Sequence, residues 1–243
     1  MKRLIYPYIL FLLLLTTGAC EKEDPGLLTG DILGQVTVFD QDQYVLEDLT
    51  NVMVELESEN LRTETATNAS GIFAFLGVDY GNYIISPRKE GYVPSSGPKE
   101  SVHHLGGYNP TRVSYRLYEI PRFRLEIDSV RLERGTSLLW LKFEDWNGEP
   151  KYWYYCRCFF SGSPEVSKDA FFTQSQGWLY GLWIENDHYE AFVENYWLNS
   201  IESDSIYIRV YPEAWGQQLY TYSVESLGQA SRVLAVKNPF LEQ

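Results

Sequence analysis

Apolar and polar residues alternate with a period of two along most of this chain, which is the pattern of half-buried β-strands. The clearest case is the run in which Val52, Val54 and Leu56 alternate with Met53 and Glu55. Glycine, proline, asparagine and serine interrupt these runs, and no long segment shows the 3.6-residue period of an amphipathic helix. The pattern predicts an all-β protein made of short strands and turns, as in β-sandwiches.

Residues 27–120 form the first predicted unit, a β-sandwich with strands around its alternating apolar residues. Gly71 and Gly81 are expected to supply the positive φ of tight turns. Residues 95–110 are rich in Gly, Pro and Ser, and we interpret them as a long loop before the last strand of this unit. Pro121 marks the boundary because proline fixes φ and breaks strand pairing.

Residues 121–243 form the second predicted unit, a separate sandwich. Its strand number favours an immunoglobulin-like or fibronectin-III-like arrangement, since about seven short strands are typical of those folds. Residues 168–173 and 189–198 are ambiguous, and either segment could hold a short helix. Strands are expected around residues 123–127, 137–144, 152–160, 178–184, 206–211, 219–224 and 232–236.

The N-terminus has the order of a secretory signal. Lys2 and Arg3 precede an apolar run at residues 4–15, which is shorter than the roughly 20 residues that span a bilayer. The small residues Thr-Gly-Ala then lead to Cys20, and this resembles the lipobox of bacterial lipoproteins. The resemblance implies that residues 1–19 are a signal peptide and that Cys20 is lipidated. A buried or disulfide-bonded cysteine is the alternative.

Residues 20–26 join the lipidated cysteine to an acidic tether with the sequence Glu-Lys-Glu-Asp-Pro-Gly. Acidic runs directly after the cysteine resemble the surface-export signal of Bacteroidetes lipoproteins. The alternative is a solvated tether, to which charge runs usually belong. The resemblance implies outer-membrane attachment through the lipid anchor at Cys20, with the protein facing the cell exterior.

Spaced glycines, valines and aromatic residues form a further pattern in the first unit. It consists of Gly34-x-Val36, Val52-x-Val54-x-Leu56, Gly71-x-Phe73-x-Phe75, Val78, Gly81-x-Tyr83-x-Ile85 and Lys89-x-Gly91-Tyr92. Over about residues 28–94 it resembles the carboxypeptidase regulatory-like domain, a small transthyretin-like or prealbumin-like β-sandwich. The Gly-x-Pro-Leu that usually precedes the second strand is missing. The resemblance implies a non-catalytic spacer or binding module and no peptidase activity.

The charge of the chain excludes a nucleic-acid footprint. There are 20 Lys+Arg against 33 Asp+Glu, a formal net charge of −13, whereas phosphate binding needs clustered positive charge. The acidic residues are spread along the chain, which indicates surface solvation and also argues against docking on anionic lipid. With 44% hydrophobic residues the chain can bury a real core.

Catalytic and metal-binding patterns are weak. His103 and His104 are adjacent, His188 lies in a polar segment, and none has a second ligand at a zinc-site spacing. We interpret them as exposed loop histidines. Asp40 and Asp42 lack the glycine and glutamate of a calcium loop and are interpreted as part of a solvated loop. We expect no enzyme activity, metal or cofactor; an enzyme with an unrecognised site is the third alternative.

Cys156 and Cys158 lie two residues apart in a predicted strand. Residues at this spacing share one face, but their Cα atoms are roughly 6.5 Å apart, so a disulfide between them would be strained. Buried thiols are the expectation. The strained bridge stays as the alternative because export permits disulfides.

All seven tryptophans lie in the second unit, more than the core of one sandwich needs. Exposed aromatic faces mark binding surfaces, and sugar rings stack on tryptophan. Core packing and contacts between the units are the alternative for any single tryptophan. The candidate ligand-binding residues, chosen because aromatic, amide and carboxylate groups lie close together in the sequence, are Trp178, Tyr180, Trp183, Tyr196 and Trp197.

The sequence therefore predicts a non-catalytic binding or adhesion module of the cell envelope, with a glycan as the favoured ligand. The alternative is a structural or protein-interaction subunit of an outer-membrane complex. Asp-Ser-aliphatic triplets at Ser129 and Ser205 resemble Bacteroidetes O-glycosylation sites, so these two hydroxyls are candidate modification sites.

Overall fold

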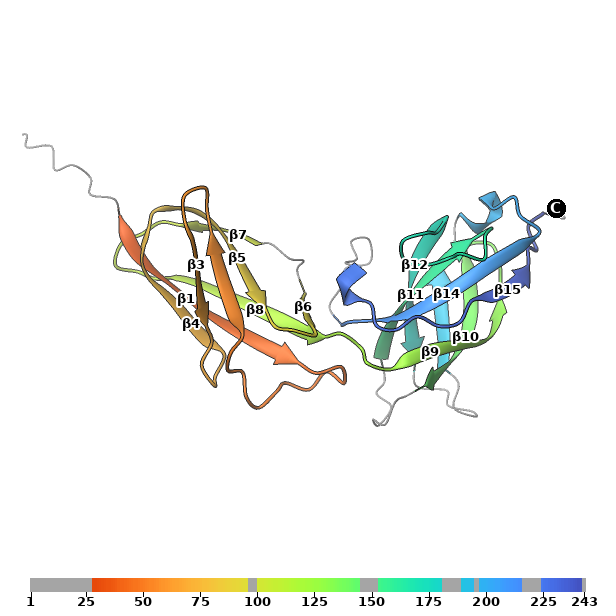
Figure 1. Ribbon diagram of the computed structural model, residues 1–243, viewed down its shortest axis with the longest axis horizontal. Coiled ribbons are helices and arrows are strands. Elements are labelled where there is room, and N and C mark those ends of the chain that lie inside the picture. Colours follow the sequence, from red (N-terminus) through yellow and green to blue (C-terminus); the bar gives the residue numbers. More distant parts are fainter. Residues whose placement is uncertain are drawn as a thin grey trace, which may run out of the picture.

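The computed structural model describes residues 28–95, 100–144, 153–180, 189–194, 197–215 and 224–241. Within these ranges the regular elements are strands, apart from two short 3-10 turns, η1 (Leu198–Ser200) and η2 (Val224–Ser226). The predicted all-β fold is confirmed. Figure 1 shows the strands gathered into two units that follow one another end to end along the long axis of the molecule.

The first unit is a sandwich of two four-stranded sheets with the orders β4-β1-β8-β6 and β3-β2-β5-β7. Alternate residues of each strand face the space between the sheets, where Val36, Leu56 and Leu117 are fully buried. β1 is antiparallel to β4 and parallel to β8. The strands are β1 (Thr29–Phe39), β2 (Met53–Glu57), β3 (Arg62–Ala66), β4 (Ile72–Asp79), β5 (Gly81–Arg88), β6 (Tyr92–Pro94), β7 (Glu100–His104) and β8 (Thr111–Glu119).

The second unit is one continuous seven-stranded sheet with the order β15-β14-β11-β12-β13-β10-β9. The sheet folds on itself, because β9 also lies close to β14. Its concave side encloses a core that includes Phe123, Leu139 and Ile208. An immunoglobulin-like sandwich has two separate sheets, whereas both walls of this core belong to one. The strands are β9 (Arg124–Arg131), β10 (Thr136–Glu144), β11 (Trp153–Ser161), β12 (Thr173–Tyr180), β13 (Tyr189–Glu194), β14 (Ser205–Glu213) and β15 (Leu234–Lys237).

Several expected boundaries in the second unit differ from the structure. Residues 189–194 form β13 and not a helix, and β12 begins at Thr173, earlier than expected. The inward positions of β12 explain the late prediction: Thr173, Ser175 and Gly177 are paired with the core residues Phe160, Cys158 and Cys156, but none of the three is a large apolar residue, so the alternation is hidden. Residues 219–223, expected to be part of a strand, lie outside the described residues.

Residues 95–110 are not one long loop, because β7 pairs with the edge of the sheet along β5. His104 on β7 is fully buried: Nδ1 lies 2.7 Å from Thr111 Oγ1, and Nε2 lies 3.1 Å from the Val78 carbonyl oxygen. A carbonyl only accepts, so Nε2 carries a proton, and in the neutral ring Nδ1 accepts from the threonine hydroxyl. The interpretation as exposed loop histidines is wrong for His104; His103 is exposed as expected, but it lies on strand β7 and not in a loop.

Gly71 closes the turn before β4 with a φ of +75°. The turn presses against β1, where the Val36 N–H donates to the Gly71 carbonyl at 2.8 Å. A Cβ on Gly71 would lie 2.1 Å from the Val36 oxygen, so no other residue fits without movement. The corresponding expectation for Gly81 is wrong, since its φ does not lie in the left-handed region.

The two units are held together by an apolar cluster, the junction cluster. Val93, Tyr118 and Ala214 are buried in it, and Ile120 and Trp215 are partly buried against them. The cluster combines residues of the first unit, of the connection and of the end of β14. The connection between the units is therefore packed.

The loop after β1 adds polar contacts to the junction. The Tyr154 hydroxyl donates to Asp42 Oδ1 at 2.9 Å, and the Arg122 N–H donates to the Gln41 side chain at 3.0 Å. Asp40 Oδ1 accepts the Tyr44 N–H at 2.7 Å. The two aspartates thus have separate partners, and the expected solvated loop is part of the contact between units.

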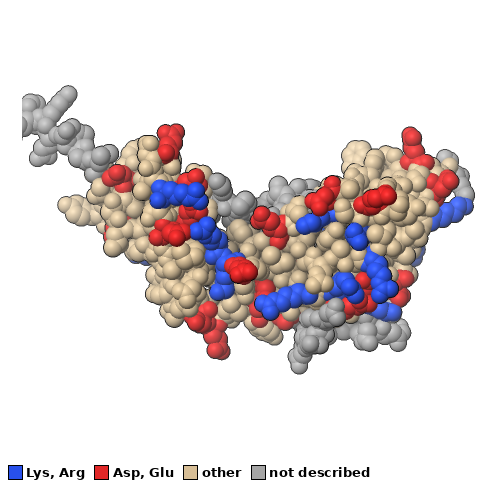
Figure 2. All heavy atoms as spheres, in the orientation of Figure 1, with Lys and Arg blue, Asp and Glu red and all other residues tan. Residues whose placement is uncertain are grey.

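The charged side chains are distributed over the surface, as their spread along the sequence predicts. Figure 2 shows acidic and basic side chains interspersed over one face of the molecule. No helix within the described part of the chain is long and apolar enough to cross a membrane.

Cys156 and Cys158 are free, fully buried thiols whose Sγ atoms lie 3.9 Å apart. The contact with Cys156 and burial raise the pKa of the Cys158 thiol well above its usual value. We expect both thiols to stay unreactive toward Ellman's reagent in the native protein and to react in urea. Reaction in the native state would contradict this burial.

Candidate functional site

The outer face of the seven-stranded sheet in the second unit carries aromatic residues. On β11, Tyr154 and Cys156 are buried in the core, so Tyr155 between them faces outward, and it is half-buried. On β13, Ala191 and Val193 are buried in the same core. Phe192 between them is 48% exposed, which is unusual for a phenylalanine.

The strand register aligns these residues. β12 runs between β11 and β13, and Trp178 is paired with Tyr155 on one side and with Phe192 on the other. Three aromatic residues therefore occupy one line across three adjacent strands, which we call the aromatic row. Cross-strand neighbours in a sheet have Cβ atoms about 4.5–5.5 Å apart, so the row is continuous. In the next line, Tyr180 is paired with Trp153 and Glu190.

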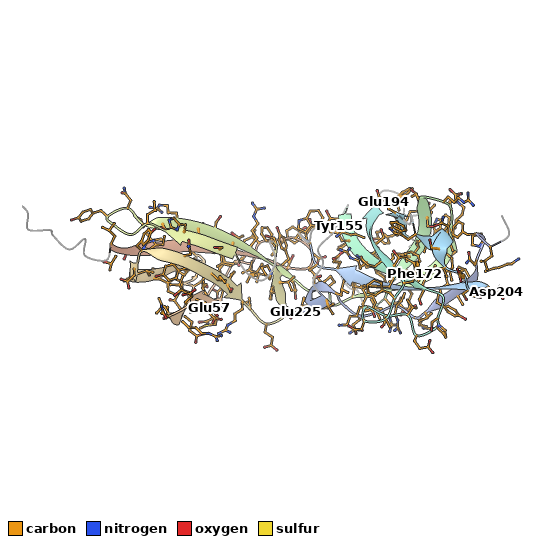
Figure 3. All side chains as sticks on the ribbon, turned by 90° about the horizontal axis from the view of Figure 1, so that it is seen from above. Glu57, Tyr155, Phe172, Glu194, Asp204 and Glu225 are labelled. Atoms are coloured by element: carbon orange, nitrogen blue, oxygen red, sulfur yellow. The ribbon has the colours of Figure 1, made fainter. Side chains whose placement is uncertain are left out.

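Two further indoles lie near the aromatic row, one against Tyr155 and one in the next line of the register. Trp215 packs against Tyr155 with a centroid distance of 4.6 Å, and it is also part of the junction cluster. On β10, Trp140 belongs to the next line, where it is paired with Glu190 and donates its Nε1–H to Glu190 Oε1 at 3.1 Å. Figure 3 places Tyr155 at the end of the second unit that faces the first. The aromatic surface thus begins at the junction and extends across the sheet.

A buried polar cluster lies beside the aromatic row on the same face. Arg157 follows Tyr155 by two positions on β11, and its Nη2 donates to Glu213 Oε1 at 2.6 Å. Gln176 donates to Glu213 Oε2 at 2.9 Å, and Gln174 accepts from Arg157 Nη1 at 2.9 Å. The Arg157 and Glu213 side chains are both fully buried.

Burial raises the pKa of Glu213 above its usual 4.5, and the hydrogen bonds from Arg157 and Gln176 lower it without offsetting this effect. Because the folded pKa lies above the unfolded one, the protonated form favours folding. This contribution is present below pH 4.5 and is lost as the pH rises through the raised pKa. The ion pair therefore holds side chains in position at a cost in stability, as is common for buried pairs.

The predicted site residues have different places in this arrangement. Trp178 and Tyr180 lie on β12 beside outward-facing residues of the neighbouring strands. Trp197 is 67% exposed, but it lies beyond the end of β13 at the start of η1, outside the row. Trp183 and Tyr196 lie outside the described residues.

The candidate modification sites also differ in exposure. Ser129 on β9 is exposed, and Ser205 at the start of β14 is half-buried. The lipidation site Cys20 lies outside the described residues, as does His188.

Sequence reasoning missed Tyr155 and Phe192 as the register neighbours of Trp178, and Trp215 as the ring that packs against Tyr155. The alternation of β11 and β13 marks the first two as outward-facing, but only the order of the strands brings them together. It also missed the polar cluster, because a charged residue at an outward strand position is normally solvated.

Metal chemistry finds no support in the described ranges. Among these residues no group of three or more His, Cys, Asp or Glu could hold an ion. The arrangement is suited to stacking and hydrogen bonding with a ligand that has apolar faces and hydroxyl groups.

No protein-family model and no curated protein matches the chain. Among solved structures, the chain is similar to a DUF3823 family protein from Parabacteroides merdae, with 13% identity and a TM-score of 0.33 over 86% of this chain and 98% of the other. It is also similar to a "putative carbohydrate binding protein" from Bacteroides uniformis, with 12% identity and a TM-score of 0.30 over 85% and 98%. A third likeness is to BcpA, the major pilin subunit of Bacillus cereus, with 14% identity and a TM-score of 0.36 over 86% and 69%. Likeness at this level leaves the function to be argued from the site itself.

Proposed function

We propose that the protein is a non-catalytic, lipid-anchored module of the outer cell surface that binds carbohydrate on the aromatic face of its second unit. The observation that carries the proposal is the aromatic row, in which Tyr155, Trp178 and Phe192 are neighbours across three strands. Aromatic residues at aligned positions on one face of a sheet would offer a platform for a flat ligand. The apolar faces of successive sugar rings stack on such a platform at low entropic cost.

Polar groups beside the row would bind the sugar hydroxyls. Glu190 supplies a carboxylate next to Tyr180 in the register, and the Trp140 indole N–H fixes one of its oxygens. The buried Arg157–Glu213 pair lies on the other side and would restrain β11 beside Tyr155. Rigidity before binding favours affinity, because less conformational freedom is lost on binding.

The anchor in this proposal is Cys20, with residues 1–19 removed and residues 20–26 as the tether. More than one acyl chain on Cys20 would give stable attachment, since a single chain binds a membrane only marginally. The first unit would serve as a spacer, and Ser129 and Ser205 would be O-glycosylation sites. Intact-mass measurement of the membrane-extracted protein tests the anchor and both modifications.

A glycan array probed with the lipid-free mature chain tests the ligand. We expect the wild type to bind at least one class of glycan, and we expect Trp178→Ala and Phe192→Ala to weaken binding by about tenfold each, which corresponds to about 1.4 kcal/mol for a lost ring contact. Isothermal titration with the selected glycan gives the ratio of dissociation constants.

Phe172→Ala is the matched control, because Phe172 is 51% exposed and precedes β12 at the end of β11 remote from Tyr155. It should bind like the wild type. Absence of binding across host and plant glycans would sink the carbohydrate proposal. If a cross-linked envelope protein co-purifies and is lost with Phe192→Ala, the surface serves protein interaction instead.

A further inference from the structure

The end of the first unit remote from the second carries a group of exposed apolar side chains, which we call the apolar tip. Tyr108 is fully exposed at 107%, and Leu105 is 63% exposed. Figure 1 shows that the start of β1 and the connection between β7 and β8 lie at this end. The members of the tip are Leu28, Leu61, Tyr80, Leu105 and Tyr108.

Backbone contacts hold the members of the tip together. The Tyr80 N–H donates to the Leu28 carbonyl at 2.9 Å, and the Gly107 N–H donates to the Thr29 carbonyl at 2.9 Å. Leu61 and Tyr80 line the same open hollow of about 610 Å³. The tip is therefore one continuous surface assembled from four segments of the chain.

Two glycines make this surface possible. Gly106 and Gly107 have φ values of +67° and +85°, and a Cβ on Gly106 would lie 2.1 Å from the Leu28 oxygen. They let the loop turn tightly against the start of β1, with Leu105 and Tyr108 on either side of the turn. A loop that only connected β7 to β8 would not need exposed apolar residues at both positions.

We propose that the apolar tip rests on the interfacial layer of a zwitterionic phospholipid bilayer. This inference depends on the lipid anchor at Cys20 proposed above. Residues 20–27 connect that anchor to Leu28, itself a member of the tip, and a chain of this length spans at most about 29 Å. The anchor would therefore keep Leu28, and the tip around it, within about 29 Å of the headgroups.

The composition of the tip fits this partner. Tyrosine is enriched at membrane–water interfaces, where its ring lies in apolar surroundings and its hydroxyl meets water. The charged residues among those that line the hollow are Glu59 and Asp79, both acidic. Anionic lipid would be repelled by them, whereas the ammonium groups of choline or ethanolamine headgroups would be attracted.

Hydrogen exchange of the mature chain on nanodiscs tests the proposal. The chain is coupled through the Cys20 thiol to a maleimide lipid, which reacts there because Cys156 and Cys158 are buried. On phosphatidylcholine discs, we expect exchange in residues 105–109 to slow by about tenfold relative to the uncoupled protein, as expected when the apolar area of two side chains leaves water. Exchange in residues 40–46, at the opposite end of the unit, should stay unchanged.

Leu105→Ser combined with Tyr108→Ser should restore the solution rate, whereas Tyr44→Ser should not, because Tyr44 is 63% exposed but lies beside the junction. Equal exchange with and without the bilayer overturns the proposal, as does slowing that survives the double substitution. If hydrogen exchange in residues 105–109 slows as much or more on phosphatidylglycerol discs than on phosphatidylcholine discs, the assignment of a zwitterionic headgroup is overturned. Protection seen only with protein-containing outer-membrane fractions assigns the tip to a protein partner. Chemical coupling makes the test independent of natural lipidation, so the anchor and the tip can fail separately.

Discussion

Replacing Glu213 by alanine is expected to destabilise the second unit by about 3–5 kcal/mol, because the buried Arg157 guanidinium would lose its counter-charge. Both side chains are fully buried and joined at 2.6 Å. Urea unfolding followed by tryptophan emission reports this unit alone, since all seven tryptophans lie in it. With slopes of about 1–3 kcal/mol per M, the midpoint should fall by about 2 M.

The double variant Arg157→Met with Glu213→Gln separates the charge from the packing. It removes both charges, keeps the side-chain volumes, and leaves an amide that can still accept from Gln176. We expect it to recover most of the loss, because replacing a whole buried pair is often neutral. Glu165→Ala removes an exposed carboxylate and should stay within about 0.5 kcal/mol of the wild type. A double variant as unstable as Glu213→Ala would contradict this account of the pair.

The second large effect is expected from Gly71→Ala, which should destabilise the first unit by about 2–5 kcal/mol. The left-handed φ of +75° costs an L-residue about 1–2 kcal/mol, and the Cβ placed 2.1 Å from the Val36 oxygen adds about 1–3 kcal/mol of overpacking. Far-UV circular dichroism in urea follows both units, whereas tryptophan emission follows only the second, so a transition that circular dichroism alone detects belongs to the first unit.

Gly91→Ala provides the matched comparison. Gly91 has a φ of +79°, but a Cβ there would meet nothing within 4 Å. We expect Gly91→Ala to lower the stability of the first unit only by the cost of the left-handed backbone conformation, about 1–2 kcal/mol. If Gly71→Ala cost no more than Gly91→Ala, the close approach of the turn to β1 would be contradicted.

The alternation of apolar residues predicts most strands because their inward side chains are apolar and their outward ones are solvated. It works for β2, where Val54 and Leu56 are buried and Glu55 is not. It fails for β7, which carries the buried His104 between short Gly- and Pro-rich segments. The sequence alone does not distinguish a buried histidine, whose two ring nitrogens both have hydrogen-bond partners, from an exposed one.

The candidate site was predictable in kind but not in detail. The excess of tryptophan in the second unit indicates an aromatic surface, yet the row also needs Tyr155 and Phe192 from other strands. Those neighbours follow from the order β11-β12-β13, which depends on long-range pairing that no local pattern encodes. The same holds for Arg157 and Glu213, which are far apart in the sequence and meet only across adjacent strands.

The parallel pairing of β1 with β8 has a mechanical consequence. The chain enters the first unit at the start of β1 and leaves it for the second unit at the end of β8, and the two strands are paired from Ile32–Thr111 to Phe39–Tyr118. A pull between a membrane anchor and a bound ligand would act on these two points in opposite directions, along the strands. The hydrogen bonds between β1 and β8 would then be loaded together in shear, and not opened one after another as in unzipping. The pairing of β1 with β8 would thus resist extension of the first unit along the line between the two points where the chain enters and leaves it.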